Sequence, residues 1–218
     1  RDWSVTGVQT CALPICLALA TYSEEPALYV SDRLLIEPLR SLGFSAEAVL
    51  WDDPQVDWSG YDAVIVRSCW DYHLRIVEFR RWITQLEMQG VRLINSPALL
   101  RWNMDKHYLQ QLAAEGIAMP PAVWLEKDQP ARLGEILREQ GWDRAVIKPL
   151  ISASGDNTFE TTPVSTALDQ ARLNHLLRAC GAVVQRFAPQ IREGEWSFVF
   201  FNGEYSHAML KTPADGGF

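Results

Sequence analysis

The chain has 218 residues, of which 48% are hydrophobic and 22% charged, so it can form one large or two small domains with a buried core. This composition excludes a disordered chain, and the lack of an apolar run of about 18 residues argues against a membrane-spanning helix. The net charge of −7, with no basic run, makes a nucleic acid an unfavourable partner.

The first fifteen residues are considered separately from the rest. Residues 5–15 (VTGVQTCALPI) resemble the translation of a common sequencing adapter, so residues 1–15 are expected to be an assembly artefact and the protein proper to begin near Cys16. The alternative is that residues 11–20 are the apolar core and cleavage site of a signal peptide. The cysteines that follow (Cys16, Cys69 and Cys180) are odd in number and widely spaced, which favours free thiols in a reducing cytoplasm.

Strand and helix patterns alternate in the first half of the chain. Apolar runs predict strands at residues 16–22, 48–51, 63–67 and 91–94. Helical spacing predicts a helix within residues 32–42, where Pro38 argues against a regular one, and another around residues 79–86, ended by Gly90. Residues 16–96 are therefore expected to form an α/β domain with a mainly parallel sheet.

A second domain of α+β character is expected over residues 97–218. Asn103 is expected to cap a helix that ends at Gly116, and helices are also predicted at residues 131–140 and 166–179. Strands are predicted at residues 122–125, 145–148, 159–161 and 182–187. Asn202-Gly203 is a strong two-residue turn signal, which predicts a hairpin of residues 195–201 and 204–211.

Two lysines carry the main chemical signal. Lys148 ends an apolar strand, where a buried amine needs an anionic partner, and the small residues 152–155 that follow could turn N–H groups toward a phosphate. Lys106, in the first turn of a helix, could complete a clamp on a polyphosphate. Taken singly, each of these features also has an ordinary explanation as a surface lysine or a turn.

The order and spacing of three segments resemble the ATP-grasp superfamily, in its glutathione synthetase-like and ribosomal-modification ligase-like branch. The segments are DKHYL (residues 105–109), VIKPLISASG (residues 146–155) and QRFAPQIREGEWSFVFFNGEYSHAMLKTP (residues 185–213). The similarity runs from Cys16 to Phe218. It implies that a parallel-sheet domain precedes an incomplete ATP-grasp module.

The resemblance also implies a role for each matching position. Lys106 and Lys148 would contact the ATP phosphates. The phosphate-covering loop would include Ser152, Ser154 and Gly155, although this loop has a single glycine where relatives often have more. The residues assigned to the base, the ribose and the reacting groups are Gln185, Arg186, Phe187 and Ala188 (linker to adenine), Ile147 and Phe187 (walls of the adenine slot), Glu195 (ribose hydroxyls) and Lys211 (γ-phosphate or acyl substrate, the catalytic candidate).

The implied activity is ATP-dependent ligation of a carboxylate to an amine or a thiol through an acyl phosphate, with Mg²⁺ bridging the phosphates. The substrate would be a small-molecule or peptide carboxylate, joined to an amine nucleophile. The metal ligands are expected beyond Phe218, so the chain is expected to be truncated there. Two alternatives remain: a nucleotide-binding module without ligase activity, and an α/β binding protein without ATP in which Lys106 and Lys148 lie far apart.

A weaker candidate for substrate binding follows the strand at residues 63–67. Arg67 could hold a substrate carboxylate beyond the carboxyl end of this strand, with Trp70 and Asp71 beside it. The alternative is that Arg67 pairs with Asp71 and the neighbouring aromatic residues are core. His207 could approach the same substrate from the predicted hairpin. The sequence does not indicate an oligomeric state.

Overall fold

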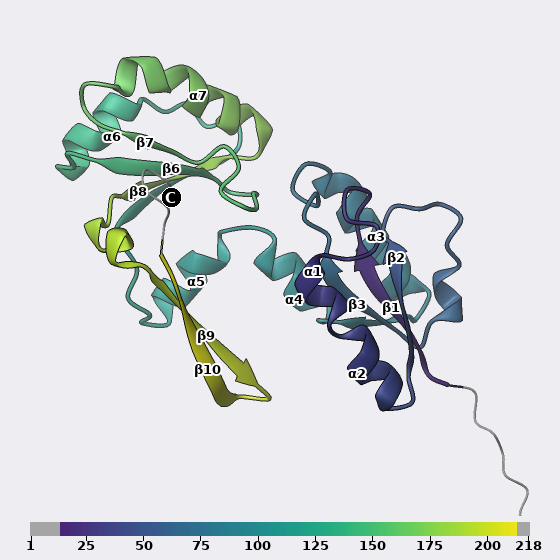
Figure 1. Cartoon of the computed structure of the whole chain (residues 1–218). Helices are drawn as coiled ribbons and strands as arrows, with labels where there is room; N and C mark the ends of the chain where they lie inside the picture. The colour runs from purple at the N-terminus through teal and green to yellow at the C-terminus, as the bar shows by residue number, and fades with distance from the viewer. Residues whose placement is uncertain (1–13, 213–218) are drawn as a thin grey trace, which may run out of the picture. The chain divides into compact units, whose positions relative to one another are not determined.

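The computed structural model describes residues 14–212, which fall into two compact units on either side of the bond between Asn103 and Met104 (Figure 1). Unit 1 ends at Asn103 and unit 2 begins at Met104. Residues 97–103 therefore belong with unit 1, whereas the sequence placed them in the second domain. None of the helices in residues 14–212 is both long and apolar enough to cross a membrane.

Unit 1 is built on a four-stranded parallel sheet, as predicted. Its strands, in the spatial order β2-β1-β3-β4, are β1 (Cys16–Thr21), β2 (Ser45–Leu50), β3 (Ala63–Ser68) and β4 (Arg92–Ile94). Strand β2 begins three residues earlier than the apolar pattern suggested, because Ser45 already pairs with Cys16. Residues at the carboxyl ends of β1 and β3 lie at the centre of one sheet edge.

Helices cover both faces of this sheet (Figure 1). They are α1 (Val30–Arg33), α2 (Ile36–Ser41), α3 (Ile76–Met88) and α4 (Pro97–Asn103), with a 3₁₀ turn at Trp58–Gly60. Leu39 of α2 packs on Leu17, Ala46 and Ala63. On α3, Trp82 lies 5.4 Å from the Trp58 ring. Right-handed crossovers that run in opposite directions from the central strands place α2 and α3 on opposite faces.

Two helix predictions in unit 1 need correction. The helix expected within residues 32–42 is split into α1 and α2, and Pro38 lies in the first turn of α2, where a missing N–H is tolerated. Asn103 does not cap a helix but ends α4. This unpredicted helix begins at Pro97, and the Leu99 N–H donates to Ser96 Oγ, so Ser96 provides the cap.

Unit 2 contains a four-stranded antiparallel sheet with the order β5-β8-β6-β7. The strands are β5 (Ala122–Leu125), β6 (Ala145–Pro149), β7 (Phe159–Thr161) and β8 (Ala182–Arg186). The helices are α5 (Tyr108–Ala114), α6 (Leu133–Gln140) and α7 (Thr166–Ala179). The α+β character predicted for this half is confirmed. Helix α6 ends at Gln140, and Gly141 follows it as a left-handed cap with a φ of 66°.

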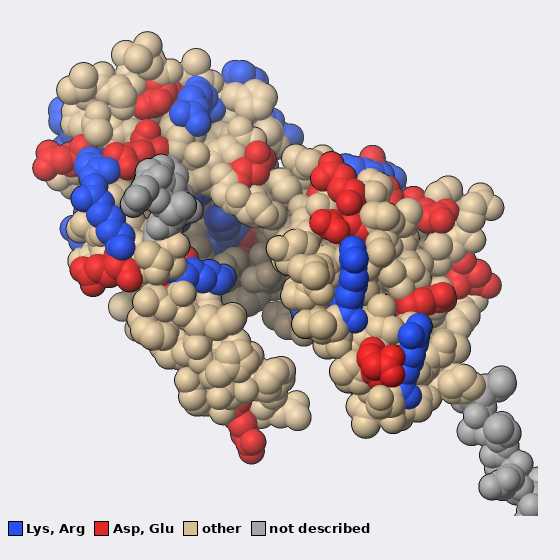
Figure 2. Space-filling model, in the orientation of Figure 1, with Lys and Arg blue, Asp and Glu red and all other residues tan. Residues whose placement is uncertain are grey.

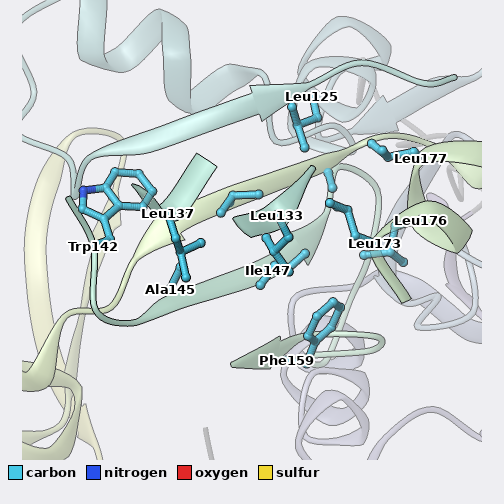
Figure 3. Packing of buried hydrophobic residues seen from close by; sticks show 12 residues of the cluster. Leu125, Leu133, Leu137, Trp142, Ala145, Ile147, Phe159, Leu173, Leu176 and Leu177 are labelled. Carbon is cyan, nitrogen blue, oxygen red and sulfur yellow. The ribbon is translucent and has the colours of Figure 1, made fainter. Parts of the chain in front are cut away.

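One face of this sheet packs under α6 and α7 and forms the core of unit 2 (Figure 3). Ile147 of β6 and Val184 of β8 are both completely buried there. Leu137 of α6 and Leu173 of α7 pack in the same cluster. Because side chains alternate along a strand, the neighbouring residues of β6 and β8 must face the other side of the sheet.

The predicted hairpin is present, with β9 (Glu195–Phe201) and β10 (Glu204–Lys211) following a 3₁₀ turn at Pro189–Glu193. Asn202 and Gly203 have φ angles of 51° and 82°, as the favoured two-residue hairpin turn requires. The hairpin exposes large apolar side chains, among them Trp196 and Phe198, and its surface is largely free of charge in Figure 2.

Two leucines of α7 provide a test of this packing. Leu173→Ala should lower the free energy of unfolding by about 2–5 kcal/mol, because Leu173 is completely buried and the surrounding core can close only part of the cavity. Leu168 of the same helix is 82% exposed, so Leu168→Ala should change the value by less than about 0.5 kcal/mol. Urea unfolding followed by circular dichroism measures both, and equal losses would contradict the arrangement.

Candidate functional site

The sheet face opposite the core of unit 2 lines a hollow of 470 Å³. Val146 and Lys148 of β6 and Gln185 of β8 lie on this face, each next to a residue that points into the core. The other lining residues come from the start of α5, the loop after β6 and the segment after β8: Lys106, Ser152, Ala153, Ser154, Gly155, Thr158, Arg186, Phe187, Ala188, Ile191 and Glu195.

Lys148 is held at the floor of this hollow by a neighbour on the adjacent strand. Its Nζ donates to Gln185 Oε1 at 2.9 Å. In the register of β6 and β8, Lys148 is opposite Val183, so Gln185 is its diagonal partner. Burial lowers the pKa of Lys148, and the charge of Glu195 offsets part of this effect. The amine is therefore fixed in position by a Gln oxygen and not by a carboxylate.

Lys106 reaches the same hollow from the start of α5. Its backbone N–H donates to Leu150 O at 2.9 Å, which ties this segment to the end of β6. Its Nζ donates to Ser152 Oγ at 2.7 Å. Burial, and then repulsion by the charge of Lys148, lower the pKa of Lys106 to about 8. Lys106 and Lys148 thus share one hollow, contrary to the hypothesis of a binding protein in which they lie far apart.

A close packing point fixes the segment that carries Lys106. Leu150, which accepts the Lys106 N–H, donates its own N–H to Gly181 O at 3.2 Å. Gly181 has a φ of 86°, and a Cβ at this position would lie 2.6 Å from both Leu125 O and Leu150 Cδ1. Glycine is therefore required here on steric and conformational grounds.

The loop of residues 152–155 borders the hollow with small side chains. Ser154 and Gly155 have φ angles of 52° and 73°. The Asp156 N–H donates to Ala153 O at 2.9 Å, which closes a turn within this loop. Small residues allow the backbone to approach a ligand closely, so the loop is suited to an anion such as a phosphate.

The segment that leaves β8 supplies an apolar wall and an acid. The Arg144 guanidinium lies 3.8 Å above the Phe187 ring, and the Phe187 N–H donates to Arg144 O, so Arg144 contacts both the ring and the backbone of Phe187. Glu195 begins β9 and pairs with Lys211 across the hairpin. Before it, Gly194 has a φ of 107°, and a Cβ there would lie 2.6 Å from Leu210 Cδ1, so the Leu210 side chain would have to move.

The structure brings all but three of the site residues predicted within unit 2 to this hollow. Ile147 was expected to form a wall of the adenine slot, but it is completely buried in the core, and Val146 lines the hollow in its place. Counting in steps of two from Lys148 would have identified Val146. Lys211 is not one of the lining residues, although its strand pairs it with Glu195. His207 also does not line the hollow and is exposed on β10, next to Ser206 Oγ.

In unit 1, the arginine predicted to bind a substrate has a partner other than the one expected. Arg67 donates to Oδ1 of Asp32 (Nη2–Oδ1 2.6 Å), and Ser68 Oγ donates to Oδ2 of the same buried carboxylate. The alternative that Arg67 pairs with Asp71 is therefore wrong. Its guanidinium is fixed by Asp32, and 46% of its side chain stays exposed.

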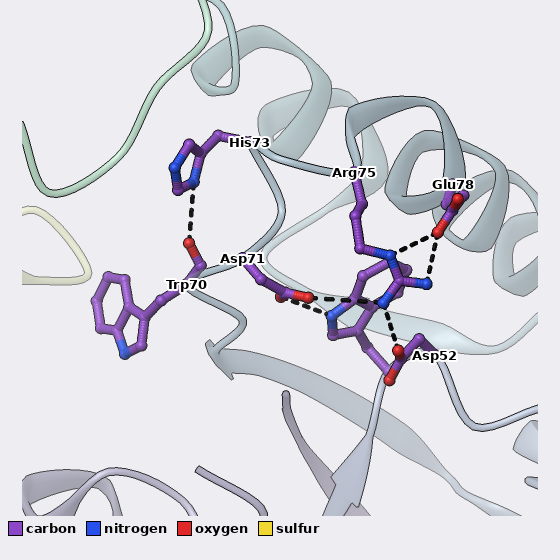
Figure 4. A network of polar contacts seen from close by, with 7 residues as sticks. Asp52, Trp70, Asp71, His73, Arg75 and Glu78 are labelled. Carbon is purple, nitrogen blue, oxygen red and sulfur yellow. Dashed lines mark hydrogen bonds and ion pairs between the residues drawn. The ribbon is translucent and has the colours of Figure 1, made fainter. Parts of the chain in front are cut away.

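The other two substrate candidates of unit 1 have different surroundings. Asp71 accepts from Trp51 Nε1 at 2.9 Å and lies 3.7 Å from Arg75 Nη1, within a network that also includes Asp52 and Glu78 (Figure 4). Asp71 thus has structural partners in this network. Trp70 is 45% exposed, and its carbonyl oxygen contacts His73 Nδ1 at 3.0 Å.

Magnesium ligands cannot be assigned to residues 14–212. No group of three or more His, Cys, Asp or Glu side chains in this range is arranged to hold a metal ion. The structure therefore leaves the predicted metal site unassigned.

Comparisons with known proteins identify the class to which this fold belongs. A RimK domain ATP-grasp protein from Sphaerobacter thermophilus has a TM-score of 0.62 at 22% identity, and the aligned part covers 84% of this chain and 68% of that one. A D-alanine–D-alanine ligase from Bacillus anthracis has a TM-score of 0.57 at 15% identity (93% and 72%). The chain has the fold of ATP-grasp proteins, and its sequence similarity to DcsG supports an assignment to that superfamily, as the resemblance of its motifs predicted.

Within this superfamily the chain is similar to D-cycloserine synthetase DcsG. Residues 17–95 match the family model for the DcsG N-terminal domain. The cycloserine biosynthesis protein DcsG of Streptomyces lavendulae is 31% identical over 185 residues, which are 81% of this chain and 60% of that protein. The crystal structure of DcsG has a TM-score of 0.83 at 27% identity (90% and 68%).

Glutathione synthetases are more distant relatives. The glutathione synthetase of Rhodopseudomonas palustris is 23% identical over 170 residues, which are 76% of this chain and 51% of that protein. The chain thus spans between half and three fifths of the length of these two curated relatives.

The proximity of the two amines can be tested by titration. The chain has only four lysines, so lysine side-chain NMR signals can be followed individually. We expect the Lys106 amine to lose its proton near pH 8, and Lys148→Met to raise the pKa of Lys106 because it removes a nearby positive charge. Burial will still hold this pKa below its usual value. Lys127→Met, on the loop after β5, is the matched control and should leave the Lys106 titration unchanged. An unaltered Lys106 pKa in Lys148→Met would contradict the shared hollow.

Proposed function

We propose that unit 2 binds ATP in the 470 Å³ hollow and that the protein is an ATP-dependent carboxylate–amine ligase. The observation that carries this proposal is the convergence of Lys106 and Lys148 on one hollow, beside a loop of small residues. Two partly desolvated ammonium groups that repel each other are stabilised when a polyphosphate lies between them. The similarity to DcsG and to glutathione synthetases supports a ligase.

The lining residues suggest how the nucleotide is oriented. Lys106 and Lys148 would neutralise phosphate oxygens, and the loop of residues 152–155 would cover them. The backbone of residues 185–188 would hydrogen-bond the adenine edge, with Val146 and Phe187 as apolar walls. The Glu195 carboxylate, at the end of the same hollow, would accept hydrogen bonds from the ribose hydroxyls.

ATP would supply the phosphoryl group that converts a substrate carboxylate into an acyl phosphate, which an amine or a thiol then attacks. The ammonium groups of the chain would stabilise negative charge on the phosphates during this transfer. Lys211 stays the catalytic candidate, because its backbone pairs with Glu195 at the edge of the hollow. Arg67, fixed by Asp32 on unit 1, is the candidate for holding the substrate carboxylate.

Mg²⁺ is proposed as a cofactor from the superfamily alone. Structural neighbours include a Bacillus anthracis D-alanine–D-alanine ligase complexed with ATP (TM-score 0.58, 13% identity) and a biotin carboxylase domain complexed with MgADP (TM-score 0.59, 12% identity). No residue of this chain is assigned to the metal. The free thiols Cys16, Cys69 and Cys180 are compatible with a reducing compartment, and the cytoplasm is the proposed location.

Removal of the floor lysine tests nucleotide binding. Lys148→Met should weaken ATP binding by at least about ten-fold, because a hydrogen bond to a charged group contributes about 1.5–3 kcal/mol. Lys127→Met removes the same charge away from the hollow and should leave the affinity unchanged. Isothermal titration calorimetry with and without Mg²⁺ measures both variants, with circular dichroism to verify folding. Equal ATP affinities of Lys148→Met and the unaltered chain would exclude this site.

The position of the ribose can be tested separately. The unaltered chain should bind ATP roughly three- to ten-fold more tightly than 2′,3′-dideoxy-ATP, because hydrogen bonds to an exposed carboxylate contribute free energies at the lower end of those to charged groups. Glu195→Ala should bind the two nucleotides equally. Glu193→Ala, two residues earlier and outside the hollow, is the matched control. A preference that persists in Glu195→Ala would place the ribose elsewhere.

ATP binding alone does not separate a ligase from a nucleotide-binding module. Release of ADP and phosphate that requires both a carboxylate and an amine indicates the ligase. ATP binding without such release, in a protein extended to the length of its relatives, indicates the alternative.

A further inference from the structure

A second cavity, of 280 Å³, lies on the same sheet face and shares three residues with the nucleotide hollow. Lys106, Lys148 and Gln185 line both. The larger hollow extends from these residues toward the hairpin, and the second cavity extends from them toward α5 and β5. The two amines are therefore accessible from both spaces.

The second cavity is mostly apolar away from the lysines. Helix α5 contributes Leu109 and Ala113, and the sheet contributes Trp124 and Val183. The ring of His107 stacks on the Trp124 indole at 5.8 Å, so His107 supports this wall. A volume of 280 Å³ is just below the range of small-molecule sites, about 300–1,000 Å³, and limits the occupant to one or two rings.

We propose that this second cavity binds a small carboxylic acid with a flat apolar body. The carboxylate would lie between Lys106 and Lys148, and the body would lie against Trp124 and Leu109. The two lysines at one end of the cavity favour an anionic group on the ligand. No carboxylate among the lining residues of this cavity neutralises them. The apolar walls favour an apolar body for the rest of the ligand, and they disfavour a bare phosphate or a sugar.

Occupancy of the second cavity affects the nucleotide hollow through the shared lysines. The carboxylate of the acid would neutralise the charges of Lys106 and Lys148, which the ATP phosphates would otherwise contact. The acid and ATP therefore compete, although the body of the acid lies in the second cavity and the nucleoside in the nucleotide hollow. This competition rests on the proposed function. Binding of the acid itself does not, since it needs only the geometry of the second cavity.

Indole-3-carboxylate is a suitable probe, and indole-3-carboxamide is its neutral counterpart. We expect calorimetry to show that the acid binds at least about ten-fold more tightly than the amide. Ala113 is an exposed residue of α5 that lines the second cavity but not the nucleotide hollow. Ala113→Leu should therefore lower the affinity for the acid by at least about ten-fold and leave the affinity for ATP unchanged. Ala114→Leu makes the same change on the next residue, outside the cavity, and should bind the acid as the unaltered chain does.

Several results would overturn the proposal. One is equal binding of acid and amide, and another is unchanged acid binding in Ala113→Leu. A third is equal weakening of ATP and the acid in Ala113→Leu, which would make the two spaces a single site. If the chain binds the acid with the expected pattern but does not bind ATP, the second cavity stands and the proposed ATP site fails.

Discussion

The arrangement of unit 2 depends on two ammonium groups that share one partly desolvated hollow. The Lys106 amine donates to Ser152 and the Lys148 amine to Gln185, and neither of these partners carries a compensating charge. Burial and repulsion disfavour the protonated amines, and the lowered pKa of Lys106 reflects both. Desolvation and repulsion of the amines destabilise the folded chain when the hollow is empty. An anion in the hollow relieves both effects, so this free energy contributes to the affinity for the anion.

The sheet makes this arrangement possible because one of its faces packs in the core and the other lines the hollow. Along β6, Ile147 completes the leucine-rich core under α6 and α7, while Val146 and Lys148 face the hollow. Gln185 does the same on β8 next to buried Val184. A shift of one residue in the pairing of these strands would place Lys148 in the core and remove the site, so core packing also fixes the position of the amine.

Features with a local signal could be predicted from the sequence, and features that depend on distant partners could not. The hairpin at Asn202-Gly203 and the end of α6 at Gly141 follow from short-range conformational preferences. The helix that starts at Pro97 was not predicted, although Ser96 before it and Pro97 in its first turn are typical of a helix start. The partner of Arg67 is Asp32, 35 residues away, and no short-range pattern indicates such a pair. The two lysines suggested a shared polyphosphate clamp, and the family resemblance supplied the roles of the other residues around it.

Gly181 shows how far the determinants of the hollow extend. It has no side chain and does not line the hollow, yet its carbonyl holds Leu150, which in turn holds the backbone of Lys106. Any larger residue at this position would collide with Leu125 and Leu150 and disturb these two backbone hydrogen bonds. Natural or laboratory variants that lose affinity can therefore map to a position without any ligand contact, and a survey restricted to the walls of the hollow would overlook them.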